Sequence, residues 1–194
     1  MKSTAIIFCL FYILILNAQN NKDLTIKILS KKIVENQNID FVIKNNSKEN
    51  YYILIDTLFL ADAKYDNSYF MNPYFILVDK KNNEVLKISN ILERSNNVDL
   101  KMSNQNFTLL EIKSNEDLYF KLQFKIERNI SAKQTSYFLV DRKKKYYASL
   151  KYTVSEMFVD MGYVKKRIEA IIKKDYKVFT GTIESNKLPV VFIE

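Results

Sequence analysis

Alternating apolar and polar positions dominate the chain, most clearly over residues 117–127. One face of an extended strand there would carry five bulky apolar side chains: Leu118, Phe120, Leu122, Phe124 and Ile126. The other face would carry charged and polar side chains. A period of two residues is typical of a strand that covers a core on one face and meets water on the other. We therefore predict a core-covering strand at 117–127.

The same period predicts further strands, separated by polar segments rich in Asn. They are expected at residues 24–28, 39–44, 51–60, 74–78, 85–88, 107–113, 137–140, 146–154, 176–183 and 190–193. We predict one hairpin from 39–44 with 51–60 and a second from 74–78 with 85–88. The strand at 51–60 is almost wholly apolar, which indicates a central, buried position. Residues 90–106 have weak periodicity and are expected to form a long connection.

One segment changes to the helical period. Between Met161 and Lys174, four apolar residues recur at i, i+4, i+7 and i+8, namely Val164, Ile168, Ile171 and Ile172. This spacing predicts an amphipathic helix over about 160–174. The predicted fold class is therefore mostly β: an immunoglobulin-like antiparallel β-sandwich with one amphipathic helix before the last strands.

Three segments of the C-terminal half carry a family resemblance. They are Leu-Tyr-Phe-Lys-Leu at 118–122, Tyr-Tyr-Ala-Ser-Leu-Lys-Tyr at 146–152 and Phe-Thr-Gly-Thr-Ile-Glu-Ser-Asn at 179–186. Together they resemble the last three strands of exported immunoglobulin-like domains common in Bacteroidota. The helix before the last strands departs from the simple form of such domains. The resemblance implies a fold and no enzymatic activity.

The N-terminus predicts export. Lys2 precedes an apolar run at residues 5–16, which is followed by a polar segment with Ala18 at the boundary. Twelve apolar residues are too few to span a bilayer, which takes about 20. The pattern is that of a secretory signal peptide over 1–18, leaving one β-sandwich domain at 19–194 without an integral membrane segment. We expect the protein in the periplasm or outside the cell.

Beyond Cys9, which lies within the apolar run, the chain has no cysteine, and it has no histidine at all. The predicted mature chain therefore excludes disulfides, zinc sites made of His and Cys, and catalysis by Ser-His-Asp or Cys-His groups. Carboxylate, Tyr or Lys chemistry and calcium bound by oxygen ligands remain possible. Asp56, Asp62, Asp66 and Asn67 are the calcium candidates, but they lack EF-hand spacing. We expect no metal or other cofactor.

The chain is basic, with 30 Lys and Arg residues against 22 Asp and Glu residues. Loss of residues 1–18 removes only Lys2, so the mature chain has 29 basic residues and a net charge of +7. Such a surface favours an acidic protein or an anionic envelope component, and export argues against nucleic acid. The candidate cations lie in two runs, with the pair Lys173 and Lys174 as a third cluster: Arg142, Lys143, Lys144 and Lys145, and Lys165, Lys166 and Arg167. They would form one patch if strand and helix lay together, or serve only as solvated faces.

Aromatic residues supply the other candidate surface, in and beside the polar segment 61–73. Its members are Tyr65, Tyr69, Phe70 and Tyr74. Exposed aromatic loops recur at interfaces, although packing in the core or within the loop is the commoner explanation of such residues. The favoured function is a non-catalytic exported binding module, such as an envelope accessory, an inhibitor or an immunity-type protein. The alternative is a carboxylate-dependent hydrolase of surface glycans, which requires two carboxylates about 5 to 10 Å apart in a cleft.

Overall fold

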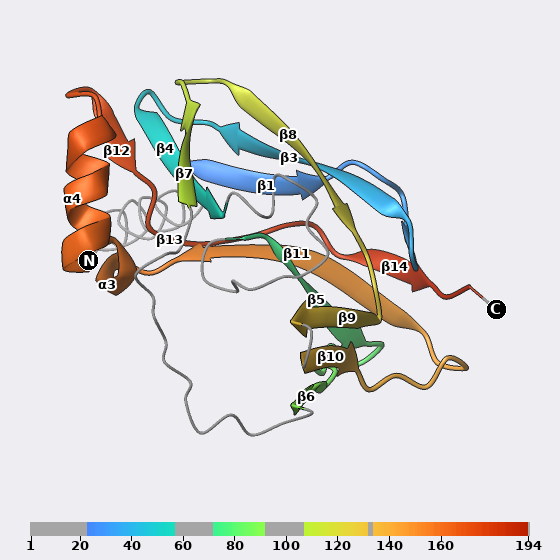
Figure 1. Ribbon diagram of the computed structural model, residues 1–194. Helices are drawn as coiled ribbons and strands as arrows, with labels where there is room; N and C mark the ends of the chain where they lie inside the picture. Colours follow the sequence, from blue (N-terminus) through green and yellow to red (C-terminus); the bar gives the residue numbers. More distant parts are fainter. Residues whose placement is uncertain (1–22, 57–71, 92–106, 132–133, 194) are drawn as a thin grey trace, which may run out of the picture.

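The computed structural model describes residues 23–56, 72–91, 107–131 and 134–193 (Figure 1). Its strands are β1 (Leu24–Ile28), β2 (Ile33–Val34), β3 (Asn38–Asn45), β4 (Asn50–Asp56), β5 (Tyr74–Asp79), β6 (Lys87–Ile91), β7 (Phe107–Ile112), β8 (Asp117–Gln123), β9 (Glu127–Ser131), β10 (Gln134–Phe138), β11 (Tyr146–Val154), β12 (Tyr176–Val178), β13 (Gly181–Glu184) and β14 (Leu188–Val191). The helices are α3 (Glu156–Val159) and α4 (Gly162–Ile171).

One layer joins two three-stranded sheets of order β1-β3-β8 and β12-β4-β7. β3 continues into β4, and β7 continues into β8, so each of these two segments passes from one sheet to the other. The predicted hairpin between 39–44 and 51–60 is therefore wrong. β3 pairs with β8 and β4 pairs with β7, in both cases antiparallel. The central position predicted for 51–60 is confirmed for β4, which lies between β12 and β7.

Asn45 explains why β3 does not turn back on itself. Its side chain is buried at the bend, where Nδ2 donates to the carbonyl oxygens of Glu49 at 2.7 Å and Lys113 at 3.0 Å. Its Oδ1 accepts from the backbone N–H and the hydroxyl of Ser47. These bonds tie the β3 to β4 bend to the β7 to β8 bend, because a buried amide must find partners for all its polar groups.

The second layer is built on β11, which pairs with β5 on one side and with β13 and β14 on the other. The second predicted hairpin is only half right. The turn after β5 forms, with a bridge between Val78 and Glu84, but β6 then pairs with β10 in a separate sheet of order β6-β10-β9. The strand predicted at 117–127 is also divided, since β8 ends at Gln123 and β9 begins at Glu127.

The core lies between the two layers (Figure 1). The period of two in the predicted strand 146–154 is confirmed in β11, since Tyr146, Ala148, Leu150, Tyr152 and Val154 are all buried. On the segment 118–126, Leu122 and Phe124 are buried and the other three inward residues pack partly buried against the same core. The hydroxyl of Tyr152 donates to the Leu54 carbonyl at 2.7 Å, which joins the layers inside the core.

The predicted helix is confirmed but shorter, because α4 ends at Ile171 and Ile172 is extended with ψ of 130°. Val164 and Ile168 are buried in a second apolar cluster with Leu54 and Phe107, whereas Ile171 is exposed. The predicted strand 176–183 is divided as well. β12 pairs parallel with β4, and the chain then crosses to β11 at Gly181, whose φ of +109° few residues other than glycine adopt.

The predicted fold class is thus confirmed as a mostly-β sandwich of largely antiparallel sheets with an amphipathic helix before the last strands. Two short pairings are parallel, β12 with β4 and β14 with β2. Within the described residues, no helix is both long and apolar enough to cross a membrane.

Candidate binding surface

Two turns lie side by side because their strands pair. β5 and β11 are antiparallel with Asp79 opposite Tyr146, so the turn after β5 adjoins the turn before β11. In the first turn, the Asp79 carboxylate accepts from the backbone N–H groups of Lys81 and Asn83 at 2.7 and 2.9 Å. The Asn83 side chain also donates to it, and these bonds lower the pKa of Asp79. Asn82 takes positive φ, which Asn tolerates. The turn is thus built without glycine.

The second turn is built in a similar way. Asp141 accepts from the backbone N–H of Lys143 on its side chain and from that of Lys144 on its carbonyl. The hydroxyl of Tyr146 accepts the N–H of Asp141 at 3.0 Å. Residues 142–145 therefore form a turn, and each aspartate holds its turn by bonding to the backbone.

Arg142 is ion-paired with Glu35, although its side chain remains 51% exposed. Its two terminal nitrogens donate to the two carboxylate oxygens of Glu35, both at 2.7 Å, and Nη1 also reaches the Ile193 carbonyl at 3.0 Å. The Glu35 side chain is 7% exposed. The guanidinium of Arg142 lowers the pKa of Glu35 by hydrogen bonding, against the opposing effect of burial. We call this pair, with the Ile193 backbone, the arginine clamp, because it ties the turn to the loop after β2 and to the chain beyond β14.

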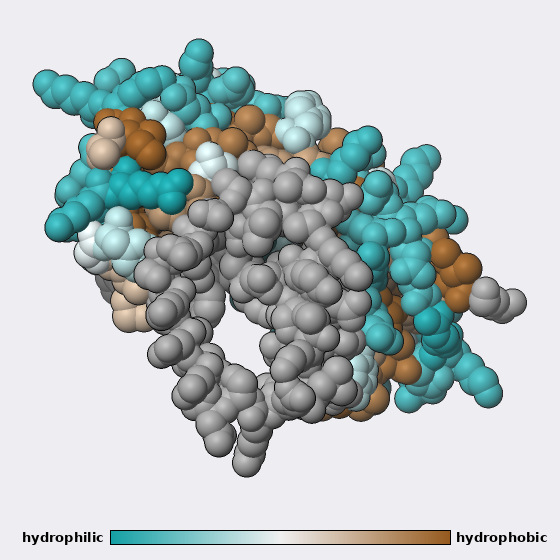
Figure 2. Space-filling model, viewed as in Figure 1, coloured by the Kyte–Doolittle hydropathy of each residue, from teal (hydrophilic) through white to brown (hydrophobic). Residues whose placement is uncertain are grey.

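Four lysines of the two turns are left with exposed side chains and, among the described residues, no ion pair: Lys80, Lys81, Lys143 and Lys145. Lys144 lies 3.7 Å from Asp141. Two large apolar side chains flank the turns, since Leu86 is 64% and Leu139 is 59% exposed. They are neighbours, because the Leu139 N–H donates to the Leu86 carbonyl at 2.9 Å. We call these four lysines and two leucines the lysine end. In Figure 2, hydrophilic residues cover this end of the molecule and the helix end alike.

The helix run is engaged differently. Arg167 donates to the Phe107 carbonyl at 2.9 Å and lies over the Phe107 ring, with its Cζ 4.4 Å from the centroid. Lys165 lies 3.7 Å from Asp160, and Lys166 is exposed. Arg167 is therefore a structural residue that fastens α4 to β7.

Glu111 makes a second attachment below the helix. It accepts from Lys173 at 2.6 Å and from the hydroxyls of Tyr52 and Tyr176 at 3.1 and 3.2 Å. Lys173 is the first cause of the lowered pKa of Glu111, through its hydrogen bond. For Tyr52 and Tyr176, burial is the first cause of a raised pKa and the bond to Glu111 the second. The Glu111 carboxylate therefore accepts three hydrogen bonds from within the protein.

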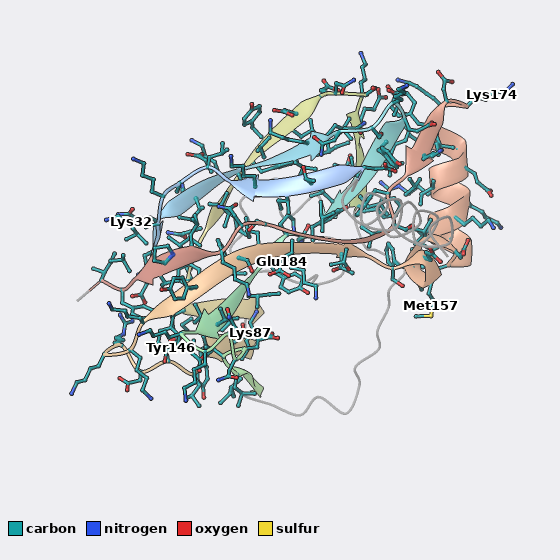
Figure 3. The ribbon with its side chains drawn as sticks, turned by 180° about the vertical axis from the view of Figure 1, so that it is seen from behind. Lys32, Lys87, Tyr146, Met157, Lys174 and Glu184 are labelled. Atoms are coloured by element: carbon teal, nitrogen blue, oxygen red, sulfur yellow. The ribbon has the colours of Figure 1, made fainter. Side chains whose placement is uncertain are left out.

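The two predicted basic runs do not form one patch. The nine residues of β11 separate the turn before Tyr146 from the helices after Val154, a length of about 26 Å at 3.3 Å per step. Figure 3 shows Tyr146 and Lys32 at one end and Met157 and Lys174 at the other. The turn that adjoins Lys143 and Lys145 instead carries Lys80 and Lys81.

The aromatic candidates are mostly outside the described residues, which include neither Tyr65, Tyr69 nor Phe70. Tyr74 begins β5, is partly buried, and lines a small pocket with Lys87, Lys125 and Phe138. Lys87 lies 5.6 Å from the centre of the Phe138 ring. The aromatic surface itself stays a prediction.

Three pockets of the described residues contain at most one carboxylate each. One groove of about 340 Å³ contains Asp40, another of about 420 Å³ contains Asp23, and the pocket at Tyr74 contains none. No group of three or more Asp, Glu, Cys or His residues is close enough there to hold a metal ion. The calcium candidates Asp62, Asp66 and Asn67 lie outside the described residues, as does the Asp56 side chain.

Comparisons with known proteins give little to add. No protein-family model matches the chain, and no curated protein matches it. Among solved structures, it is similar to a Salmonella enterica SafA pilin in complex with the SafB chaperone, with 8% identity and a TM-score of 0.28. The match covers 89% of this chain and 55% of that one, so this chain spans about half of its length. A similarity this low supports no functional argument.

Proposed function

We propose that the protein is an exported, non-catalytic binding module whose lysine end contacts an acidic partner protein. The observation that carries the proposal is the convergence of Lys80, Lys81, Lys143 and Lys145 from two adjacent turns, without described ion pairs. The two turns also contain Asp79, Glu84 and Asp141, but their cations outnumber these acids. An excess of one charge on one end attracts a partner of opposite charge and speeds its encounter. Export rests on the signal-peptide pattern of residues 1–18, and the domain would then span 19–194.

The two leucines favour a protein over a glycan. Leu86 and Leu139 are exposed beside the lysines, and protein interfaces combine an apolar centre with a charged rim. An anionic polysaccharide presents hydroxyls and carboxylates, for which exposed leucines offer little. The turns are also rigidly bonded by Asp79, Asp141 and the arginine clamp, so little conformational entropy would be lost on binding.

The hydrolase alternative receives no support from the three grooves and pockets, each of which contains at most one carboxylate. Three partly or fully buried carboxylates are engaged: Glu35 by Arg142, Asp117 by Lys44 and Glu111 by Lys173. We therefore retain the binding module as the conclusion, and its resemblance to exported immunoglobulin-like domains of Bacteroidota as part of the proposal.

The test compares matched charge reversals at the two ends. The protein is immobilised and exposed to an envelope extract, to polyglutamate and to alginate, and retained material is eluted in steps of salt. We expect a discrete protein to be retained at moderate salt and lost by Lys143→Glu/Lys145→Glu and by Lys80→Glu/Lys81→Glu. The control Lys166→Glu/Lys174→Glu makes the same charge change at the helix end and should keep the protein bound.

Three outcomes would contradict the proposal. Equal loss in the control would mean that only net charge matters. Retention of alginate in preference to any protein, abolished by the same reversals, would assign the lysine end to a glycan. Release of everything at the first salt step would leave these lysines as a solvated face, since weak polyion contacts are screened by salt.

A further inference from the structure

β8 is a full-length strand at the border of its sheet. It pairs with β3 over seven residues without a bulge, and no described strand lies on its other side (Figure 1). The neighbouring border strand β7 is different, because Arg167 and Lys173 of the helix region bind its Phe107 carbonyl and its Glu111. An open border strand presents unpaired backbone groups that can bind another strand.

The β3/β8 ladder determines which backbone groups face outward. Asn45 N–H donates to the Glu116 carbonyl, and Phe124 N–H donates to the Gln37 carbonyl. In an antiparallel pair, bonded positions alternate, so these two bonds place the backbone groups of the even-numbered residues 118–122 toward β3. The backbone groups of Tyr119 and Lys121 then face the open border.

The charges on the outer face of β8 are ordered in a self-complementary way. Asp117 is 2.7 Å from Lys44 of β3, and Lys121 is 3.8 Å from Asp40 of β3. Between them, Tyr119 is 68% exposed, although it is opposite the buried Val42. Tyr119 is therefore midway between a negative charge, two residues before it, and a positive charge, two residues after it.

We propose that two copies of the chain associate through β8, antiparallel and centred on Tyr119. In this register Asp117 is opposite the partner's Lys121, and Lys121 is opposite the partner's Asp117. Each row across the joined sheets then alternates in sign: Lys44, Asp117, the partner's Lys121 and the partner's Asp40. The outward backbone groups of both strands form the ladder, and Tyr119 packs against the partner's Tyr119. Such a two-fold, self-complementary contact closes on itself as a dimer.

The test uses two charge-reversal variants, each of which should dimerise poorly alone, whereas their mixture should dimerise. Sedimentation velocity of the purified protein over a concentration series should show a dimer. Lys121→Glu, and separately Asp117→Lys, convert both cross-strand ion pairs to like-charge pairs and should weaken self-association about tenfold or more. An equimolar mixture of the two variants should regain the dimer, because each chain carries the sign that the other requires. A merely destabilised variant would not be rescued in this way.

Lys27→Glu is the matched control, since Lys27 is exposed on β1, away from the β8 border, and its reversal should leave the dimer unchanged. Circular dichroism checks that each variant folds. If Asp117→Lys does not fold for lack of the Lys44 pair, Lys121→Glu alone remains decisive. A protein that is monomeric up to its solubility limit, a dimer indifferent to Lys121→Glu, or a mixture of folded variants that stays monomeric would each overturn the proposal. None of these results depends on the lysine end.

Discussion

The turn before β11 and helix α4 each carry consecutive cations, and they lie at opposite ends of the sandwich. At the helix end, Arg167 is bound to a backbone carbonyl and Lys173 to Glu111, while Lys165 lies near Asp160. At the turn, only Arg142 has an enclosed acid, while Lys143 and Lys145 have no described ion pair.

The difference lies in what the fold places opposite each cation. Glu35 is 107 residues from Arg142, and Glu111 is 62 residues from Lys173. A run of like charges in the sequence therefore mixes cations that are bound within the protein and cations that have no ion pair among the described residues. Only the second kind is available to a partner. Stability measurements separate the two kinds, since loss of a structural cation leaves an acid or a carbonyl without its partner.

The arginine clamp should give the largest loss of stability. Glu35→Ala removes two charge-assisted bonds and a bond from the Ile193 N–H, and should lower the free energy of unfolding by about 1.5–3 kcal/mol. Arg142→Ala should cost more than Glu35→Ala, because it leaves a carboxylate that is 7% exposed without its cation. Urea denaturation measures both. An Arg142→Ala protein as stable as the wild type would show that the clamp contributes nothing.

Arg167 should give the next largest effect. Arg167→Ala loses the bond to the Phe107 carbonyl and the contact with the Phe107 ring, for an expected cost of about 1–2 kcal/mol. The adjacent Lys166→Ala is the control and should change stability by less than about 0.5 kcal/mol, because its side chain is exposed. Equal losses of stability for the two substitutions would mean that Arg167 contributes no more to the fold than its exposed neighbour Lys166.

Local pattern predicted the strand faces and the helix, but it could not predict their neighbours. The inner residues of β11 follow from a period of two, because burial of alternate side chains is a local property. The pairing of β3 with β8 instead depends on the Asn45 bend, whose partners Ile112 and Lys113 lie more than sixty residues away. β6 leaves β5 for a similar reason, since its ladder is made with β10.

The candidate site was only partly accessible from sequence for the same reason. Lys143 and Lys145 were found as a charge run, but Lys80 and Lys81 became relevant only through the opposition of Asp79 and Tyr146. Glu35 and Glu111 carry no signal of their own, because a single carboxylate in a loop or strand is ordinary. Arg142 is bound by Glu35 and is not available to a partner, and this is recognised only once its distant acid is known.

The dependence of stability on acidic pH should differ between the two ends, and this is the smallest of the expected effects. Both Glu35 and Glu111 have a pKa below the ordinary value of 4.5 in the folded protein, Glu35 through Arg142 and Glu111 through Lys173. A depressed carboxyl pKa stabilises the fold above the unfolded value, and this contribution is lost as pH falls through the folded pKa. Wild-type stability should therefore decline below about pH 4.5, as urea denaturation at a series of pH values would show.

Glu35→Gln should flatten that decline more than Glu111→Gln does. The Glu35 side chain is 7% exposed and that of Glu111 is 37% exposed, so solvent screens the second pair more strongly. Each variant is less stable than the wild type at neutral pH, and the two curves approach the wild type in acid. Because the comparison concerns the slope with pH, it is separate from the packing cost of either substitution. A steeper contribution from Glu111 would mean that the helix end, and not the arginine clamp, holds the more strongly coupled carboxylate.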